Sequence, residues 1–374
     1  MLWSNLRTGL HALRRHMGFT AINIAGLGVG IAVSMLLLLF VRSELAVNDV
    51  FPDAERIHRI DSWRTDASST RYITTHPLGE TIERQAPGVE ARTWLYGLWV
   101  TVGAEGAYYR RDTFLTNPGF FDVFDLPLRH GTPDTALDQP RSAVLRADVA
   151  RTLFGTTDVV GRTVDVKTYR NGSQAYTVTG VWETLPRNSV TQFRGEEFKM
   201  LLSEVGTWDF TPESAWSQWQ APFLLQYVRL AETARVRDLS AALDALVDAS
   251  APDDVAETLA VGLSPLTEVY LTRADNAGWQ RIYLMAALSA FVLLIAGINF
   301  TNLATARSLD RVREIGVRKT LGARRGQLTR QFLVEAVLVS SAATGLGAGL
   351  VALGRPAFEH LVGMELVLQT PWDA

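Results

Sequence analysis

Cysteine is absent from this 374-residue sequence, so disulfide bonds do not hold the fold together. Lysine is scarce as well, since it occurs only at Lys167, Lys199 and Lys319, and none of the three follows a glycine. A Walker A loop needs a Gly-Lys pair to hold phosphates. The sequence also lacks a His-Glu-x-x-His zinc motif and a Gly-x-Ser-x-Gly nucleophile elbow. We therefore expect neither catalytic residues nor a metal site in this chain.

Charge and composition narrow the class of protein further. The chain has 36 Lys plus Arg against 39 Asp plus Glu, a net charge of −3. A pI near 6.1 argues against nucleic acid as a partner. Hydrophobic residues make up 47% and charged residues 20% of the chain, which excludes a disordered protein. The length corresponds to two or three domains.

The hydrophobic residues gather in long uncharged runs near the two ends of the chain, at 19–41, 282–303 and 336–354. About 20 apolar residues suffice to cross a bilayer as a helix. The first run is too long for the apolar core of a signal peptide, so we interpret it as an uncleaved anchor. We predict a membrane protein with three transmembrane helices, at 19–41, 282–303 and 332–355.

The distribution of basic residues predicts the orientation of these spans. Residues 1–18 hold three arginines and no acid, and residues 304–331 hold eight basic and two acidic residues. Residues 42–281 hold 24 basic and 33 acidic residues, so their net charge is 24 − 33 = −9. Cytoplasmic loops are enriched in Lys and Arg. We expect 1–18 and 304–331 in the cytoplasm, and 42–281 and the tail 356–374 outside it.

The 240-residue segment 42–281 is large enough to fold into domains of its own. Alternation and turn residues predict strands at 55–64, 89–103, 223–230 and 259–271, and helices at 76–88 and 234–249. Short strands such as 175–183 lie between these two β-α-β units. The expected fold is α+β, built from 49–105 and 196–272, with a mostly β subdomain, 106–195, inserted in it. Trp208, Trp216 and Trp219 are candidates for its core or for a groove that binds a lipophilic partner.

Two glycine pairs inside the hydrophobic runs are candidate helix contacts. Gly26 and Gly30 lie in the first run, and Gly345 and Gly349 in the third, each pair four residues apart. Glycines at this spacing let the backbones of membrane helices approach closely. We therefore assign these four residues to transmembrane packing.

The basic segment 304–336 carries the most distinctive pattern. Leu309, Val312, Ile315 and Gly316 recur at spacings of three and four, which predicts a short amphipathic helix, and Gly322 ends it. Its basic residues suit contact with anionic lipid. Its apolar stripe, with Glu314 in the middle, suits docking into a groove of a partner protein. The pattern leaves both interpretations open.

Several stretches resemble a known family in order along the chain. Residues 297–328 contain Arg-Glu-Ile-Gly-x-Arg-Lys-x-Leu-Gly-Ala, which resembles the signature of the FtsX-like permease domain. Four further stretches resemble the MacB-like periplasmic core domain, namely 48–60, 117–155, 160–166 and 178–193.

The resemblance implies a type VII ABC transporter permease in the cell inner membrane, with a porter-plus-sabre domain in the periplasm. It implies that ATP-driven motion passes from a separate ATP-binding subunit, which holds ATP and Mg²⁺, to the periplasmic domain of this chain, for efflux or mechanotransmission. This chain itself is expected to bind no cofactor. Dimerisation with a second permease half and contact with a periplasmic partner are further implications. The residues that match the coupling signature are Arg313, Glu314, Ile315, Gly316, Arg318 and Gly322. Those that match the end of the second span are Asn299, Asn302 and Arg307, and of these Asn299 and Asn302 are also expected in transmembrane packing.

The family has four spans, and the sequence shows three, so a fourth span is expected after Pro371 and the chain resembles a permease truncated at its carboxyl end. A fragment without function is therefore one alternative. A membrane-anchored regulator or scaffold of the FtsX type, which activates a periplasmic partner, is another. An enzyme in 42–281 ranks below both, because no catalytic constellation is visible in the sequence.

Overall fold

The residues of the computed structural model divide into two units. Met1–Leu45 and Asn276–Ala374 form one, here named the helical unit, and Ala46–Asp275 form the other, here named the sheet domain. The structure describes residues 17–46, 48, 51–66, 70–71, 73–104, 106–168, 170–183, 185, 192–193, 196–197, 199–205, 209–210, 212–310, 316–317, 320, 325–362, 364 and 366.

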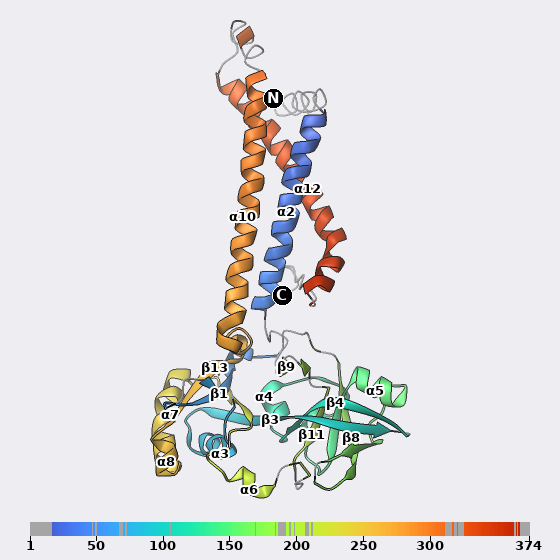
Figure 1. The fold of residues 1–374 in the computed structure, drawn as a ribbon, viewed down its shortest axis with the longest axis vertical. Helices are drawn as coiled ribbons and strands as arrows, with labels where there is room; N and C mark the ends of the chain where they lie inside the picture. Colours follow the sequence, from blue (N-terminus) through green and yellow to red (C-terminus); the bar gives the residue numbers. More distant parts are fainter. Residues whose placement is uncertain are drawn as a thin grey trace. The chain divides into compact units, whose positions relative to one another are not determined.

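Long apolar helices make up the helical unit: α2 (Met17–Leu45), α10 (Arg273–Asp310) and α12 (Arg325–Val362) (Figure 1). Each contains a stretch that is long and apolar enough to cross a membrane, at Met17–Leu45, Ala277–Ala306 and Phe332–Val362. The prediction of three candidate spans is confirmed.

Both α10 and α12 are longer than the spans predicted for them. Each has 38 residues, which corresponds to about 57 Å of helix against about 30 Å of hydrocarbon in a bilayer. Helical backbone therefore continues beyond 282–303 and 332–355. Residues 356–362, expected to begin a tail, continue α12, because Pro356 lies inside the helix without ending it.

One part of the sheet domain has the chain order βαββαβ. Its strands are β1 (Ile57–Arg64), β3 (Val89–Ala104), β12 (Leu225–Leu230) and β13 (Leu259–Pro265), arranged as β13-β1-β12-β3 and antiparallel throughout. Helices α3 (His76–Gln85) and α7 (Val236–Ser250) complete two β-α-β units. These are the elements that alternation predicted. The last predicted strand is shorter than 259–271, because it ends at Pro265 and α9 (Leu266–Val269) follows.

The apolar faces of these elements form one core. Ile60 and Val228 from the strands meet Leu78 and Ile82 of α3 and the apolar stripe of α7, which consists of Leu239, Leu243 and Val247. The stripe repeats every four residues, so α7 buries one face and leaves the other to water.

The second part of the sheet domain continues the same sheet. Beyond β3 the order is β4 (Ala107–Thr116), β11 (Met200–Ser203), β6 (Ser142–Arg146), β8 (Ser173–Trp182) and β5 (Leu128–Gly131), and β7 (Thr163–Lys167) pairs with β3 and β8. The shorter elements are η1 (Ala54–Arg56), β2 (Thr70–Arg71), α4 (Phe120–Phe124), η2 (Pro133–Thr135), α5 (Ala147–Phe154), β9 (Gln192–Phe193), β10 (Glu196–Glu197), α6 (Glu213–Trp216) and α8 (Asp253–Ala256).

Strand β11 lies on the other side of the boundary that the sequence suggested. Residue 195 was expected to end the inserted part, but Met200–Ser203 pair with β4 on one side and with β6 on the other. All four residues of β11 are buried. The inserted strands therefore extend past residue 195, and β3 and β4 join them to the βαββαβ part without a break in the sheet.

Two of the three tryptophans that the sequence singled out are described. Trp216 is buried in the core of the inserted part, beside Trp94 and Phe223. Trp219 is partly buried and packs against the core of the βαββαβ part. Both therefore serve the core. Trp208 lies outside the described residues.

Candidate functional site

The segment predicted to couple the chain to a partner lies between α10, which ends at Asp310, and α12, which begins at Arg325. Arg313, Glu314, Ile315, Arg318 and Gly322 lie outside the described residues. Gly316 and Val317 are helical and exposed, and nothing lies within 4 Å of a side chain placed at Gly316.

Helix α2 packs closely against α10 through small residues. A Cβ atom placed at Gly30 would overlap Cβ of Ala296, and one at Gly26 would lie 3.4 Å from Nδ2 of Asn299. Between the same helices the hydroxyl groups of Ser34 and Ser289 lie 2.7 Å apart and are buried. Ser289 Oγ also lies 3.1 Å from the carbonyl oxygen of Ser34. Gly26, Gly30 and Asn299 therefore lie in the contact between α2 and α10.

A different pair of glycines brings α2 against α12. A Cβ atom at Gly28 would lie 3.0 Å from Leu346 and 3.2 Å from the carbonyl oxygen of Ala343. One at Gly347 would lie 2.9 Å from Cγ2 of Ile31 and 3.1 Å from the carbonyl oxygen of Gly28. Nothing lies within 4 Å of a Cβ atom at Gly345 or at Gly349, and Asn302 is exposed.

The periodicity of a helix explains why Gly28 and its neighbours face different partners. Successive residues are about 100° apart, so a residue two positions away points about 200° round the helix. Gly26 and Gly30 therefore face α10 while Gly28 faces α12. Sequence reasoning missed Gly28 and Gly347 because spacing alone does not say which face of a Gly-x-Gly-x-Gly run meets a neighbour.

An ion pair joins α2 and α10 near the end of α2. Oε2 of Glu44 lies 3.6 Å from Nη2 of Arg281, and the side chain of Glu44 is 2% exposed. A buried carboxylate needs such a partner, because its desolvation costs several kcal/mol. Polar contacts therefore connect α2 to α10 at two positions along the helices, at Ser34 and Ser289 and again at Glu44 and Arg281.

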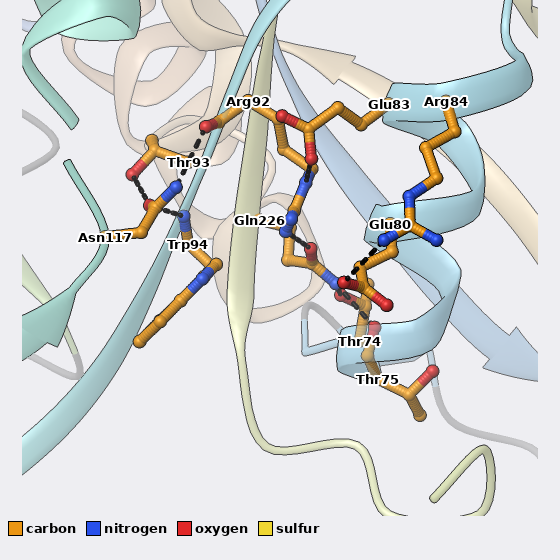
Figure 2. A network of polar contacts seen from close by, with 10 residues as sticks. All are labelled: Thr74, Thr75, Glu80, Glu83, Arg84, Arg92, Thr93, Trp94, Asn117 and Gln226. Atoms are coloured by element: carbon orange, nitrogen blue, oxygen red, sulfur yellow. Dashed lines mark hydrogen bonds and ion pairs between the residues drawn. The ribbon is translucent and has the colours of Figure 1, made fainter. Parts of the chain in front are cut away.

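A buried polar network in the sheet domain holds α3 on the sheet (Figure 2). Gln226 of β12 donates to Oγ1 of Thr74 at 2.7 Å and to the carbonyl oxygen of Thr75 at 2.5 Å. Its own amide oxygen accepts a 3.0 Å hydrogen bond from Arg92, which also binds Glu83 of α3 at 2.8 Å. The Gln226 amide occupies the space beside Gly79, where a Cβ atom would overlap it, so this position requires glycine.

His76 begins α3 inside an aromatic cluster. Its ring meets Trp216 edge-on at 4.8 Å and Trp94 at 6.3 Å, measured between centroids. Burial, and after it the positive charge of Arg92, lower the pKa of His76 to about 4. The imidazole is therefore neutral at pH 7 and acts as a part of the core.

Asp209 is the centre of a second buried network. Its carboxylate is fully buried and accepts hydrogen bonds from the side chains of Arg141, Asn171 and Tyr176. Burial raises the pKa of Asp209, but these hydrogen bonds outweigh it, and the net pKa is lowered. Among the described residues no group donates a hydrogen bond to the carboxyl group of the nearby Glu204, and burial, followed by the charge of Asp209, raises its pKa to about 8.

The hydrogen bonds of these two networks connect helices and strands to one another. Within the part of the chain that the structure describes, no three His, Asp or Glu side chains come together in a way that would hold a metal ion. The polar side chains of Figure 2 bind one another and the backbone. The two main features of the described residues are the close packing of α2 against α10 and α12, and a single continuous sheet.

Comparisons with known proteins agree with this arrangement. Residues 20–246 match the MacB-like periplasmic core domain, and residues 286–374 match the FtsX-like permease C-terminal domain. The chain is 27% identical over 258 residues to an uncharacterized ABC transporter permease, YknZ, of Bacillus subtilis (strain 168), a match that covers 66% of this chain and 57% of YknZ. It is 43% identical over 79 residues to the macrolide export ATP-binding/permease protein MacB of Rhodopseudomonas palustris (strain HaA2), covering 21% of this chain and 12% of that protein.

Solved structures of similar description also match the chain. A domain of a putative permease from Porphyromonas gingivalis has a TM-score of 0.48 and 25% identity, and covers 62% of this chain and 99% of that one. The extracellular domain of YknZ from Gram-positive bacteria has a TM-score of 0.37 and 17% identity, with coverages of 55% and 99%. The match to the core-domain family spans more than half of the sequence, so this chain belongs to the ABC transporter permeases that combine a MacB-like periplasmic core domain with an FtsX-like permease domain.

Proposed function

We propose that this chain transmits movement, driven by ATP binding to a separate subunit, to its extracytoplasmic sheet domain. Membership of the family establishes that the chain is an ABC transporter permease, and the proposal starts from this. The separate ATP-binding subunit fits a sequence without a Gly-Lys pair. Pairing with a second permease half, contact with lipid, and a place in the inner membrane belong to the same proposal.

The observation that carries this proposal is the central place of α2 among the helices. Its glycines contact α10 on one side and α12 on the other, and the segment 311–324 connects those two helices. A displacement of that segment would reach α2 through both contacts. The sheet domain follows α2 in the chain and ends within the first residues of α10. Glu44 and Arg281 hold these two helices together.

The coupling step is testable at Ile315. In Ile315→Asp a carboxylate would stand in the apolar stripe, where docking into a partner would remove it from water at a cost of some kcal/mol. We expect the ATP-binding protein that co-purifies with the wild-type chain to be lost, while the variant still inserts into the membrane. Val317→Asp, two residues away and about 200° round the predicted helix, is the matched control. Unchanged co-purification of Ile315→Asp would favour contact with lipid instead.

The orientation is testable with reporter fusions. A phosphatase that is active only outside the cytoplasm should be active after Pro140, in the sheet domain, and inactive after Gly322. The expectation rests on the eight basic residues of 304–331 and on the net charge of 24 − 33 = −9 in 42–281. The opposite pattern would refute the orientation and the coupling together.

A further inference from the structure

One exposed face of the sheet carries two cations, Arg110 and Lys167, that form no ion pair with the residues that the structure describes. Arg110 of β4 and Lys167 of β7 both lie opposite Thr101 of β3, so the three residues form one row across three strands. Among the described residues, neither cation forms an ion pair, and the Thr101 hydroxyl has no hydrogen-bond partner. The row therefore offers two positive charges and a hydroxyl group to something outside the domain.

Two aromatic rings border this row, one on each side. Trp99 is 47% exposed and Tyr108 is 52% exposed. The guanidinium of Arg110 lies over the Trp99 ring at 5.4 Å, and the ammonium of Lys167 lies 5.1 Å from the centre of the Tyr108 ring. Cation–π contact holds the charges in place while their outer sides stay in water. We call these five residues the aromatic–basic row.

The backbone is built to hold this arrangement. Gly103 lies opposite Tyr108, and a Cβ atom at Gly103 would overlap the Tyr108 ring. Because no side chain stands there, the ring can lean over β3 toward β7 and meet Lys167. The opposite face of β3 is fixed in the core through Leu98, Val100 and Val102. The row is thus preorganised, which lowers the entropy cost of binding.

The charges in and around the aromatic–basic row indicate which kind of ligand it binds. The row is basic although the segment around it is acidic, with a net charge of 24 − 33 = −9 over residues 42–281. Asp112 lies opposite Trp99, and Asp165 lies opposite Gly103, one register step to either side of the row. These carboxylates would repel a densely charged anion. They favour a ligand with acidic groups spaced to meet the two cations alone.

We propose that the aromatic–basic row binds an extended, acidic and proline-containing segment of a partner protein outside the cytoplasm. Trp, Tyr and Arg are the side chains that dominate binding energy at protein interfaces. Two strand spacings separate the backbone positions of Arg110 and Lys167 by about 10 Å. A polyproline II segment repeats every three residues, or about 9.3 Å, so the glutamates of Glu-Pro-Pro-Glu match the spacing of the strands that carry the two cations, and its prolines can meet the rings. The proposal shares with the proposed function only the side of the membrane on which the domain lies, and needs no ATP.

The test uses the full chain in phosphatidylcholine nanodiscs and a fluorescent peptide that repeats Glu-Pro-Pro four times, with binding followed by anisotropy at low salt. We expect saturable binding that weakens at least tenfold in the double variant Arg110→Glu with Lys167→Glu. Tyr108→Leu, which keeps both cations, should weaken binding several-fold. The matched control changes the same net charge on α7 and its cap, Arg235→Glu with Arg237→Glu, and should bind within twofold of the wild type.

Several results would overturn the proposal. Absence of peptide binding by the wild type would exclude this occupant. Equal binding of a Gln-Pro-Pro repeat, or full binding by the double variant, would show that the two cations do not select the ligand. Binding of phosphatidylglycerol vesicles through Arg110 and Lys167, without binding of the peptide, would assign the row to lipid. None of these assays involves the ATP-binding subunit, so their outcome is separate from that of the coupling test.

Discussion

Glu204 makes the stability of the sheet domain depend on pH in the neutral range. Both oxygens of its carboxyl group are buried and have no hydrogen-bond partner among the described residues. Burial, and then the negative charge of Asp209, raise the pKa of Glu204 from 4.5 to about 8. The folded domain therefore holds this group protonated at pH 7, whereas the unfolded chain holds it charged.

The direction and size of the effect follow from that difference. A carboxyl group with a raised folded pKa contributes its full stability below the unfolded pKa, and this contribution is lost as the pH rises through the folded pKa. For a shift from 4.5 to about 8, the loss between pH 5 and pH 8 is about 3–4 kcal/mol. A domain of this size loses about 2–4 °C in Tm per kcal/mol.

Glu204→Gln removes the titration and keeps the shape of the side chain. We expect the variant to gain about 7–14 °C in Tm over the wild type on going from pH 5 to pH 8. The assay is thermal unfolding of the detergent-solubilised chain, followed by tryptophan fluorescence. Glu213→Gln, at an exposed position of α6, is the control and should show no such gain.

The comparison between variant and wild type cancels the pH-dependent contributions that other titrating groups make to stability. His76 has a pKa lowered to about 4, so its contribution is present above the unfolded value of 6.5 and is lost as the pH falls toward 4. Because both proteins contain His76, their difference reports Glu204 alone. A Tm difference that is the same at pH 5 and at pH 8 would refute the reasoning.

Three further substitutions test other contacts. Gly79→Ala should destabilise the sheet domain by about 2–4 kcal/mol in urea unfolding, although alanine is the better helix former, because its methyl group would displace the buried Gln226 amide; an increase in stability would contradict this packing. Gly347→Leu should reduce the steady-state amount of the membrane-inserted chain and its α2–α12 cross-linking, whereas Gly345→Leu should not, and equal effects would contradict the assigned face. Asp209→Asn should cost about 2–3 kcal/mol, measured by the same unfolding assay, because Arg141 loses a charged acceptor; a cost below 0.5 kcal/mol would contradict it.

The sequence predicted those elements whose pattern is local. The strand at 55–64 and the helix at 234–249 were visible because one face of each is apolar, and the structure has them as β1 and α7. The place of β11 was not visible, because a four-residue strand buried on both faces shows no alternation. Gln226 gave no signal either, since its partners come from the residues just before α3 and from β3, far away in the sequence.

The residues of the candidate sites also fall into those that local spacing predicts and those that depend on the tertiary structure. Gly26 and Gly30 could be chosen from spacing, while Gly28 and Gly347 depend on how three helices surround one another. Thr101 became part of a site only through strand register, which places it between residues 9 positions and 66 positions away, Arg110 and Lys167. The coupling residues came from the resemblance, and Ile315 and its neighbours stay a prediction.

The sixteen residues of β3 form a single strand that belongs to both parts of the sheet domain. At 3.3 Å per residue it is about 53 Å long, and it pairs with β12 near its start and with β4 and β7 toward its end. A hinge between the two parts would break this ladder of backbone hydrogen bonds. Val89 and Ala104 are therefore held at a fixed separation within one sheet, and a rotation of the domain about Val89 would displace the residues near Ala104 the most.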